Sequence, residues 1–530
     1  MLILQGVSYI HQNGDLLFDQ INLKINKQDK IALIGHNGAG KSTLFNILTG
    51  NLAPSSGLFQ TETKPYIVPQ HFGQYNALTI AEALQIDDKI NALYEILDGQ
   101  VTDLNLAALN DDWGIEERCA AALRYWGIEG LELNASLKNL SGGQKTKVFL
   151  AGIFVHQPEI VLLDEPSNHL DSTGRGVLYD YITGTLNTLV VISHDRTLLN
   201  LTDTVCELNK NGIKVYGGHY DDYVQQKEIE REALNQDLKG QEKALRKAKT
   251  VEKASLERQH KLDARGKKKQ EKAGVARISM NTLRNNAEKS TSRMKDVHAE
   301  RVHEISEGLT QLRKELPDAD KMKIGFDNSA FHRGKVLVTA EDINFGYNAQ
   351  KLWKQPLNFR IAVGERIALK GANGSGKTTL IKLILGQLVP QTGTLTRAAA
   401  INTIYIDQDY SLIDPRISIY EQAQLANSGA LQEHEIKIRL NRFLFTKEFW
   451  DKSCSTLSGG EKMRLMLCCL TINVLTPDII VLDEPTNNLD IQNIEMLTAA
   501  VQEYQGTLLV VSHDEYFLKQ IDIKRTIALC

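Results

Sequence analysis

Two segments of the sequence combine glycines, a lysine and a hydroxyl in an order that suits phosphate binding. The segments span residues 35–42 and 371–378, and both have the pattern Gly-x4-Gly-Lys-Ser/Thr. The glycines let backbone amides turn toward the β- and γ-phosphates, while the lysine neutralises phosphate charge and the hydroxyl can bind Mg²⁺. The predicted phosphate contacts are Gly35, Asn37, Gly38, Gly40, Lys41, Ser42 and Thr43 in the first segment, and Gly371, Asn373, Gly374, Gly376, Lys377, Thr378 and Thr379 in the second.

Both segments also lie in a suitable context. Each follows a short apolar stretch and opens a helix-like stretch, so we expect a strand, a loop and a helix at both places. The N-terminus of such a helix adds the positive end of its dipole to the site. One match can arise by chance, but two in the same context indicate two phosphate sites.

Each phosphate loop is followed, further along the chain, by an apolar strand that ends in two acids, EIVLLDE and DIIVLDE. Successive side chains of a strand point in opposite directions, so the two acids of a pair must act differently. Asp164 and Asp483 are expected to hold Mg²⁺, and Glu165 and Glu484 to polarise the attacking water as catalytic bases. An acid that only caps a turn would not explain why both pairs follow a phosphate loop.

Two histidines and two glutamines recur at matching places. His194 and His513 follow apolar strands, and each lies 29 positions after its glutamate, which indicates a catalytic contact with the γ-phosphate. Gln70 and Gln408 lie between the phosphate loop and a later LSGG segment, a place that fits a role with Mg²⁺ and water. The predicted metal ligands are Ser42, Gln70, Asp164, Thr378, Gln408 and Asp483.

Aromatic residues near the start of each half are candidates to stack on an adenine ring. Tyr9 is the candidate in the first half, and either Phe345 or Tyr347 in the second. An aromatic residue in an opening strand is otherwise usually part of the core.

These landmarks recur because the chain is a tandem duplication. IALIGHNGAGKSTL at 31–44 is answered by IALKGANGSGKTTL at 367–380, and LSGG, DEP and SHD segments follow in the same order. The first copy carries about 21 extra residues somewhere within 71–139. The duplication predicts two α/β domains of the P-loop type, over residues 1–223 and 323–530.

A charged segment at 224–322 separates the copies. Its apolar residues fall at three- and four-residue steps, which predicts two long helices paired as an antiparallel hairpin with a break near residues 266–274. Residues 239–295 hold 18 Lys and Arg against 6 Asp and Glu, whereas the whole chain has a net charge of −4. A solvated face is the usual explanation of a charged helix, but this one-sided excess favours an anionic partner such as RNA. The predicted RNA contacts are Lys267, Lys268, Lys269, Lys272, Arg277 and Arg284.

Composition excludes several classes of protein. The longest apolar runs are strand-sized, far short of the roughly 20 residues of a membrane helix. The first residues lack the pattern of a secretion signal. The six cysteines show no repeated CxxC spacing, which argues against a disulfide framework and against zinc or iron–sulfur sites. We therefore expect a cytoplasmic protein.

Together the motifs resemble the ATP-binding cassette (ABC) superfamily over nearly all of both copies. The resemblance implies ATP and Mg²⁺ as cofactors, and it implies that the LSGG segment of one cassette contacts the γ-phosphate held by the other. Two composite ATPase sites within one monomer are therefore expected. The LSGG contacts it implies are Ser141, Gly142, Gly143, Ser458, Gly459 and Gly460. Glu461 departs from the glutamine that is usual after this segment.

Three features resemble the F group of that superfamily (ABC-F): paired cassettes without membrane spans, the segments DEPSNHLD and DEPTNNLD, and the long charged linker. Members of this group bind the ribosome near the tRNA exit site, reach toward the peptidyl-tRNA with the linker, and couple ATP to translation or to antibiotic protection. The resemblance implies the same for this chain, with ribosomal RNA and tRNA as partners. It also implies an ordinary helical subdomain within 71–139 rather than an elaborate inserted arm.

Other functions share the nucleotide residues. The ATPase subunit of a membrane transporter would not usually carry a long basic hairpin, and a ribosome-recycling factor with iron–sulfur clusters would need clustered N-terminal cysteines. A chromosome ATPase would place its coiled coil inside one split cassette. The sequence leaves open whether a translation factor or an antibiotic-protection factor is present, and we favour the former.

Overall fold

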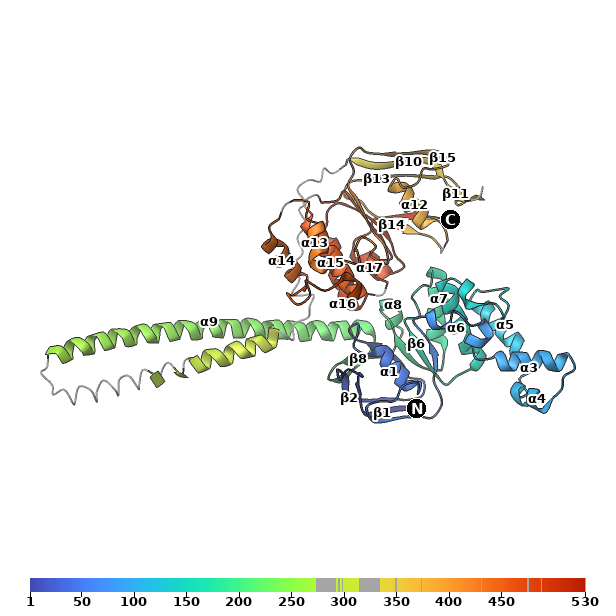
Figure 1. Cartoon of the computed structure of the whole chain (residues 1–530), viewed down its shortest axis with the longest axis horizontal. Helices are drawn as coiled ribbons and strands as arrows, with labels where there is room; N and C mark the ends of the chain where they lie inside the picture. The colour runs from blue at the N-terminus through green and yellow to red at the C-terminus, as the bar shows by residue number, and fades with distance from the viewer. Residues whose placement is uncertain are drawn as a thin grey trace. The chain divides into compact units, whose positions relative to one another are not determined.

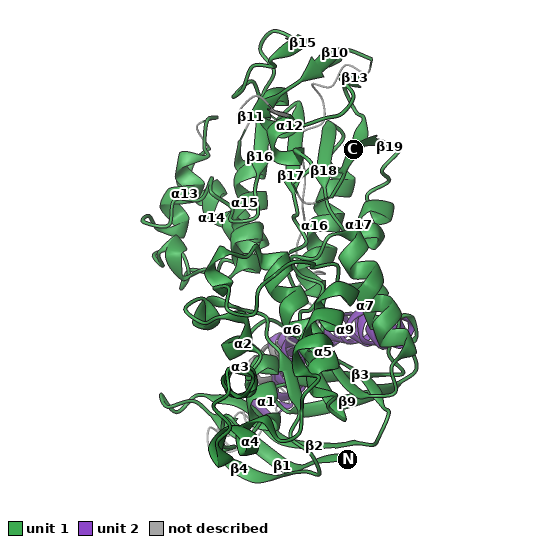
Figure 2. Ribbon diagram, turned by 90° about the vertical axis from the view of Figure 1, so that its right-hand side faces the viewer, with its two compact units in different colours: residues 1–223, 322–530 green, residues 224–321 purple. Residues whose placement is uncertain are grey.

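The computed structural model describes residues 1–272, 292–293, 296–297, 299–313, 334–347, 350–372, 374–429, 431–473, 476–487 and 489–529, without the side chains at 263, 266–272 and 350. These residues form two compact units (Figure 2). One unit comprises residues 1–223 together with 322–530, and the other comprises residues 224–321.

The first cassette is built around a six-stranded sheet of order β5-β6-β7-β3-β8-β9, parallel except for the β8–β9 pair. Every residue of β6 and β7 is buried, as expected for parallel strands covered on both faces. The strands are β3 (Lys30–Ile34), β5 (Tyr66–Val68), β6 (Ile160–Asp164), β7 (Thr188–Ile192), β8 (Thr204–Asn209) and β9 (Gly212–Gly217).

A smaller antiparallel sheet of order β2-β1-β4 packs beside this sheet and shares its core. Its strands are β1 (Leu2–Ile10), β2 (Leu16–Ile25) and β4 (Ser56–Thr61). The helices are α1 (Lys41–Leu48), α2 (Ile80–Ala83), α3 (Asp87–Leu97), α4 (Asp103–Leu109), α5 (Ile115–Tyr125), α6 (Gly142–His156), α7 (Ser172–Gly184) and α8 (Arg196–Leu199), with 3₁₀ turns at Gly73–Tyr75 and Leu137–Asn139.

The second cassette repeats this plan. Its parallel sheet has the order β16-β17-β18-β14-β19, its antiparallel sheet the order β13-β10-β15, and β11 and β12 form a short hairpin. The strands are β10 (Val336–Asn344), β11 (Gly346–Tyr347), β12 (Gln350–Lys351), β13 (Leu357–Ala362), β14 (Arg366–Lys370), β15 (Thr392–Arg397), β16 (Thr403–Ile406), β17 (Ile479–Asp483), β18 (Thr507–Val511) and β19 (Arg525–Ala528). The helices are α12 (Lys377–Ile384), α13 (Ile419–Leu425), α14 (Glu433–Arg442), α15 (Gly459–Ile472), α16 (Ile491–Glu503) and α17 (Glu515–Gln520), with a 3₁₀ turn at Cys454–Thr456.

The additional length of the first cassette lies in its helical subdomain. Isolated bridges close this subdomain in both cassettes, from Thr79 to Ser136 in the first and from Ser418 to Ser453 in the second. The helices α3 and α4 lie within the first interval, at the end of the cassette away from β1 and β2 (Figure 1), and the described residues of the second cassette hold no equivalent pair. The sequence predicted an ordinary subdomain here, and the structure adds a helical pair to it.

The linker unit contains one long helix. Helix α9 (Tyr220–Lys272) has 53 residues, which corresponds to about 80 Å at 1.5 Å per residue. It continues through Gly266, because its many Lys, Glu, Ala and Gln residues favour helix and one interior glycine costs only about 1 kcal/mol. Its last residue, Lys272, lies within the interval 266–274 in which the sequence predicted the break. A second helical stretch at 299–313 lies beside α9 (Figure 1), and Arg313 forms an ion pair of 2.8 Å with Glu242. Leu309 of that stretch is buried.

Candidate nucleotide-binding and catalytic sites

The first phosphate loop connects β3 to α1 and holds its lysine folded back over the loop. Gly40 caps α1 in the left-handed region, at φ 96°, and a Cβ there would come within 2.8 Å of the Leu17 and Phe18 side chains, so only glycine fits. Nζ of Lys41 donates to the carbonyl oxygens of Gly35, at 2.7 Å, and His36, at 3.1 Å. A buried ammonium is thereby held at a helix N-terminus, where a phosphate would neutralise it.

The second loop has the same geometry between β14 and α12. Gly376 caps α12 at φ 88°, and Nζ of Lys377 donates to the carbonyl oxygens of Gly371, at 2.7 Å, and Ala372, at 3.3 Å. The predicted contact Asn373 lies outside the described residues.

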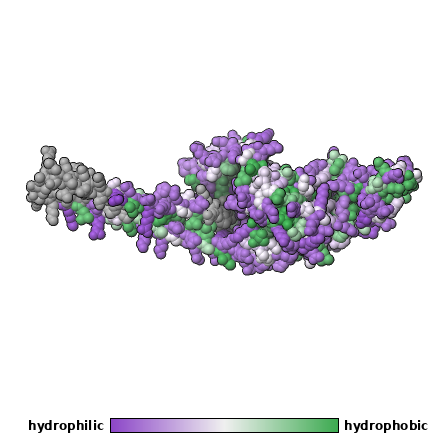
Figure 3. All heavy atoms as spheres, turned by 90° about the horizontal axis from the view of Figure 1, so that it is seen from below, coloured by the Kyte–Doolittle hydropathy of each residue, from purple (hydrophilic) through white to green (hydrophobic). Residues whose placement is uncertain are grey.

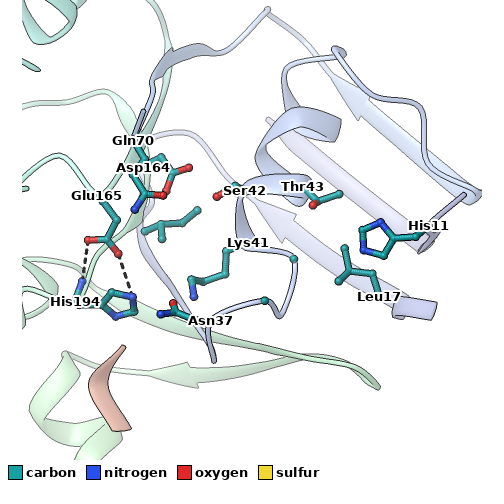
Figure 4. Close-up of a pocket in the computed structure, with 13 residues that line it drawn as sticks. His11, Leu17, Asn37, Lys41, Ser42, Thr43, Gln70, Asp164, Glu165 and His194 are labelled. Atoms are coloured by element: carbon teal, nitrogen blue, oxygen red, sulfur yellow. Dashed lines mark hydrogen bonds and ion pairs between the residues drawn. The ribbon is translucent and has the colours of Figure 1, made fainter. Parts of the chain in front are cut away.

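A cavity of about 390 Å³ opens over the first loop. Figure 4 shows the carboxylate of Glu165, the ammonium of Lys41 and the His194 ring at one end, and His11 beside Leu17 at the other. The predicted residues that line the cavity are Asn37, Gly38, Gly40, Lys41, Ser42, Thr43, Gln70, Asp164, Glu165 and His194. The matching cavity of about 600 Å³ in the second cassette is lined by the predicted residues Tyr347, Gly374, Gly376, Lys377, Thr378, Thr379, Gln408, Asp483 and Glu484. The structure thus brings together, in each cassette, residues predicted to bind phosphate and Mg²⁺ and the glutamate predicted to act as the base.

In the first site, Glu165 and His194 form a buried pair. Glu165 has φ 50°, and its backbone amide donates to the Ile192 carbonyl oxygen at 2.8 Å, so the strand end is pinned in a left-handed turn. The His194 amide donates to Oε2 of Glu165 at 3.3 Å, and Nε2 of His194 lies 3.3 Å from Oε1. Within the described structure, Oε1 of Glu165 and Nδ1 of His194 are buried without a hydrogen-bond partner. Such unsatisfied polar atoms are expected where a substrate or water completes the site.

The second site has the same pair at similar distances. Glu484 has φ 49°, and its Oε2 accepts a hydrogen bond of 3.3 Å from the His513 amide. Nε2 of His513 lies 3.5 Å from Oε1 of Glu484 and has no hydrogen-bond partner among the described residues.

Burial disfavours the ionised form of both glutamates and so raises the pKa of each. Burial and the neighbouring Asp164 raise the pKa of Glu165, against the opposing charge of Lys41. Burial likewise raises the pKa of Glu484, to about 6, and the positive charge of Arg175 acts most strongly against that rise. Burial lowers the pKa of His513 to about 4, so this imidazole is neutral near pH 7. A carboxyl group whose pKa lies close to the working pH suits a general base.

The residues that could hold Mg²⁺ differ between the two cassettes. Burial raises the pKa of Asp164, and a hydrogen bond with Ser42 opposes the rise, so the two predicted Mg²⁺ ligands lie side by side. Asp483 instead accepts a hydrogen bond of 2.8 Å from the Tyr405 hydroxyl. Tyr405 lies three residues before Gln408, where the first cassette has Ile67, so comparison of the two copies did not point to Tyr405. The described residues contain no cluster of three acidic, histidine or cysteine side chains that could hold a metal.

The rings near each cavity follow one pattern. Tyr9 and Phe345 pack partly against the cores, whereas His11 and Tyr347, two residues later, line the cavities. The Tyr9 ring meets the His11 ring edge to face at 5.6 Å, and Phe345 meets Tyr347 likewise at 5.2 Å. Sequence reasoning missed His11, because a histidine in a turn after a strand carries no distinctive signal.

The LSGG segments open helices, as expected, but their serines are held differently. Ser141 caps α6, and its amide donates to the Gln144 side chain at 2.9 Å. Ser458 caps α15, and both its amide, at 2.8 Å, and its hydroxyl, at 2.7 Å, donate to Oε2 of Glu461. The hydroxyl of Ser458 is therefore already engaged by a negative charge.

Residues that follow the DEP segment of one cassette contact the phosphate loop of the other. The backbone amide of Asn37 donates to Oδ2 of Asp490 at 3.1 Å, and Nε2 of Gln492 lies 3.2 Å from Nε2 of His36. Asp490 also acts electrostatically on His194, and Asp171 acts in the same way on His513. In each site, the negative charge of an aspartate from the opposite cassette therefore acts to raise the pKa of the histidine.

Several known proteins resemble this chain over most of its length. The family model described as "ABC transporter" matches residues 18–168 and 354–487. The chain is 30% identical to the ABC transporter ATP-binding protein YfmM of Bacillus subtilis, over 98% of this chain and 97% of the relative. It is also 30% identical to ABC transporter F family member 5 of Arabidopsis thaliana, over 96% of this chain and 72% of the relative. The ATP-binding protein Uup of Escherichia coli is 29% identical over 95% of this chain and 76% of its own length.

Among solved structures, the archaeal ribosome recycling factor aABCE1, crystallised with the ribosomal stalk protein aP1, has a similar fold. The TM-score is 0.60 at 18% identity, over 98% of this chain and 86% of that one. In the part of the chain that the structure describes, no helix is both long and apolar enough to cross a membrane.

Proposed function

This chain belongs to the ABC family, within its F group, and is an ATPase, and from that premise we propose that it couples ATP hydrolysis at two composite sites to ribosome binding and translation. Each site would combine the phosphate loop of one cassette with the LSGG segment of the other. The contact of Asp490 with the phosphate loop at Asn37 supports this pairing, because it brings the second cassette to the first loop.

The residues divide the chemistry between them. Lys41 and Lys377, with the glycine-rich loop amides, bind the phosphates of ATP, and the ring of His11 or Tyr347 lies where adenine can stack. Mg²⁺, held by Asp164 with Ser42 and Gln70 and by Asp483 with Thr378 and Gln408, would neutralise developing phosphate charge. The catalytic bases Glu165 and Glu484 take a proton from the attacking water, and His194 and His513 contact the γ-phosphate.

The linker supplies the observation that carries the ribosome proposal. From Lys239 to Arg265, helix α9 exposes nine basic side chains to solvent. The described linker side chains are mostly hydrophilic (Figure 3). Such a helix suits the phosphates of RNA as a sequence-independent partner.

The predicted tip contacts lie beyond this stretch. Lys267, Lys268, Lys269 and Lys272 belong to α9, but their side chains lie outside those described, as do Arg277 and Arg284 entirely. We propose that they bind ribosomal RNA or tRNA. The F group also suggests a place near the tRNA exit site, a cytoplasmic location and action as a monomer. The fold neighbour aABCE1 is named a ribosome recycling factor, which agrees with a ribosomal partner.

Co-sedimentation with ribosomes tests this proposal. A chain with Glu165→Gln and Glu484→Gln should hold ATP and stay in its closed form, so it should sediment with ribosomes more in ATP than in ADP. Association should weaken as salt rises, because each phosphate contact contributes roughly −0.7 to −0.9 to the slope of log K against log salt. Neutralising the six tip residues should make that slope shallower by about 4 to 5 if all six contact phosphate.

A matched control neutralises six exposed lysines on the cassettes. The control positions are Lys24, Lys64, Lys210, Lys351, Lys354 and Lys519. This variant has the same change in net charge but should keep the parent slope. Equal slopes in the parent and the tip variant would contradict the RNA role of the linker tip, and an absence of ATP-dependent sedimentation would contradict the ribosome proposal as a whole.

A further inference from the structure

The interface between the cassettes is chemically unequal, although the cassettes are duplicates. Helix α7 of the first cassette begins after Asp171 and carries Arg175 in its first turn, and helix α16 of the second begins after Asp490 and carries Ile494 at the same place. Both side chains are buried. A guanidinium with five donors therefore stands at one position, and a side chain with no polar atom at the other.

Arg175 reaches the catalytic segment of the second cassette. Its Nη1 lies 3.5 Å from the carbonyl oxygen of His513, and its charge acts on Glu484. The same nitrogen lies 3.4 Å from Oδ2 of Asp195, and Nε donates to the Leu170 carbonyl oxygen at 3.3 Å. The guanidinium is thus anchored in the first cassette while one edge faces the second.

The anchor itself is firmly held. Asp195 caps helix α8 by accepting hydrogen bonds from the amides of Thr197 and Leu198, and it accepts a hydrogen bond of 2.5 Å from the Tyr179 hydroxyl. Because Asp195 directly follows His194, Arg175 bridges the segment that carries one catalytic histidine and the segment that carries the other. A planar guanidinium with several donors is suited to such a bridge, whereas lysine presents a single charged point.

The backbone of His513 is therefore held at both its N–H and its carbonyl group. Its amide donates to Oε2 of Glu484, and its carbonyl oxygen faces Arg175 from the opposite cassette. In the first site, the His194 amide donates to Glu165 in the same way. At the position equivalent to Arg175, however, Ile494 offers no donor to the His194 carbonyl.

We infer that Arg175 is a positioning residue that acts across the interface on the second site, by fixing the His513 segment against Glu484, and so makes the two ATPase sites unequal. The inference rests on the composite sites proposed above. Docking of the cassettes completes the second site through this contact, whereas the first site closes without an equivalent. Hydrolysis at the second site therefore depends more than hydrolysis at the first on close approach of the two cassettes around Arg175.

Steady-state ATPase of single-site chains, without ribosomes, tests the inference. Glu165→Gln leaves hydrolysis to the second site, and Glu484→Gln leaves it to the first. Arg175→Ile, which transplants the residue of the other cassette, should lower kcat in the Glu165→Gln chain by roughly tenfold, as expected for a misplaced catalytic group. KM for ATP should change by less than about twofold, and kcat in the Glu484→Gln chain should fall much less.

Arg196 provides a matched control. It lies on the same interface, 3.4 Å from Glu495 and 4.8 Å from the Tyr516 ring, but has no described contact with His513. Arg196→Gln should therefore affect the two single-site chains to a similar extent. Arg175→Lys keeps a cation beside Asp195 and should fold even if Arg175→Ile does not, with a smaller loss confined to the same site.

Three outcomes would overturn the inference: similar losses in both chains, the same pattern for Arg196→Gln, or a rise in KM with kcat unchanged. The assay contains no ribosomes, so its result is independent of the ribosome proposal. If neither glutamate substitution lowered hydrolysis, the assignment of the catalytic bases would fail instead, which is a separate result.

Discussion

Replacing Glu165 and Glu484, the two proposed catalytic bases, by glutamine should slow turnover strongly while leaving ATP binding intact. The side chains are buried, and glutamine has nearly the same shape, so its amide oxygen can still accept the hydrogen bonds from the His194 and His513 amides. The lost feature is the second carboxylate oxygen, which in Glu165 is buried without a hydrogen-bond partner in the described structure. The substitution therefore removes proton acceptance and little else.

The size of the effect follows from that role. Positioned acid–base groups contribute about 10²- to 10⁴-fold to rate, or roughly 3 to 5 kcal/mol of barrier. Phosphate release in steady state should fall by this factor, while ATP affinity measured by equilibrium dialysis stays within about threefold of the parent. Hydrolysis near the parent rate would refute the assignment of Glu165 and Glu484, and loss of ATP binding would mean that they hold nucleotide instead.

Three further results are expected. Alanine at Lys41 and Lys377 removes a phosphate contact from the ground and transition states alike, so ATP affinity in dialysis should fall at least about tenfold. Glu461→Gln weakens the competitor for the Ser458 hydroxyl and removes a negative charge, so the KM for ATP in a Glu484→Gln chain should fall a few-fold, and a rise would contradict this reasoning. Burial raises the pKa of Glu165 from an ordinary 4.5 to about 8, so the unfolded chain loses this proton first and wild-type stability falls as pH rises between these values. Glu165→Gln should therefore raise the free energy of unfolding by about 1 to 3 kcal/mol at pH 8 but not at pH 4.5, as measured by denaturant unfolding without nucleotide.

Local spacing was enough to predict the local structure that carries each candidate site. The phosphate loops, the acid pairs and the LSGG helix starts depend on residues close together in sequence, and the structure forms each of them as a strand end or a helix N-terminus. The duplication also predicted two similar cassettes, which the family match at 18–168 and 354–487 confirms.

Residues brought in by other elements could not be predicted in this way. Tyr405 reaches Asp483 because β16 and β17 are neighbours, and Arg175 reaches His513 only through the interface of the cassettes. Neither residue has a counterpart of the same type in the other copy. Comparison of the two copies, which pointed to the other site residues, therefore could not point to these two.

The sequence also showed where the first cassette has extra residues, but it did not predict the structure of those residues. The spacing showed that about 21 residues are added within 71–139, and the structure places helices α3 and α4 there. The predicted interval 266–274 contains Lys272, the last residue of α9, but propensity could not choose the end within it, because the cost of one glycine at 266 is small against the helix-favouring residues around it.

Substitution of the LSGG serines, one cassette at a time, tests the composite sites most directly. In a Glu484→Gln chain, hydrolysis comes from the site that contains Lys41 and Glu165. Ser458→Arg then places a bulky cation where the opposite cassette should contact the γ-phosphate, and Ser141→Arg makes the matched change in the cassette that holds Lys41. The account predicts that Ser458→Arg lowers phosphate release at least about tenfold more than Ser141→Arg does. The reverse order would show that each cassette uses its own LSGG segment, and would contradict the account.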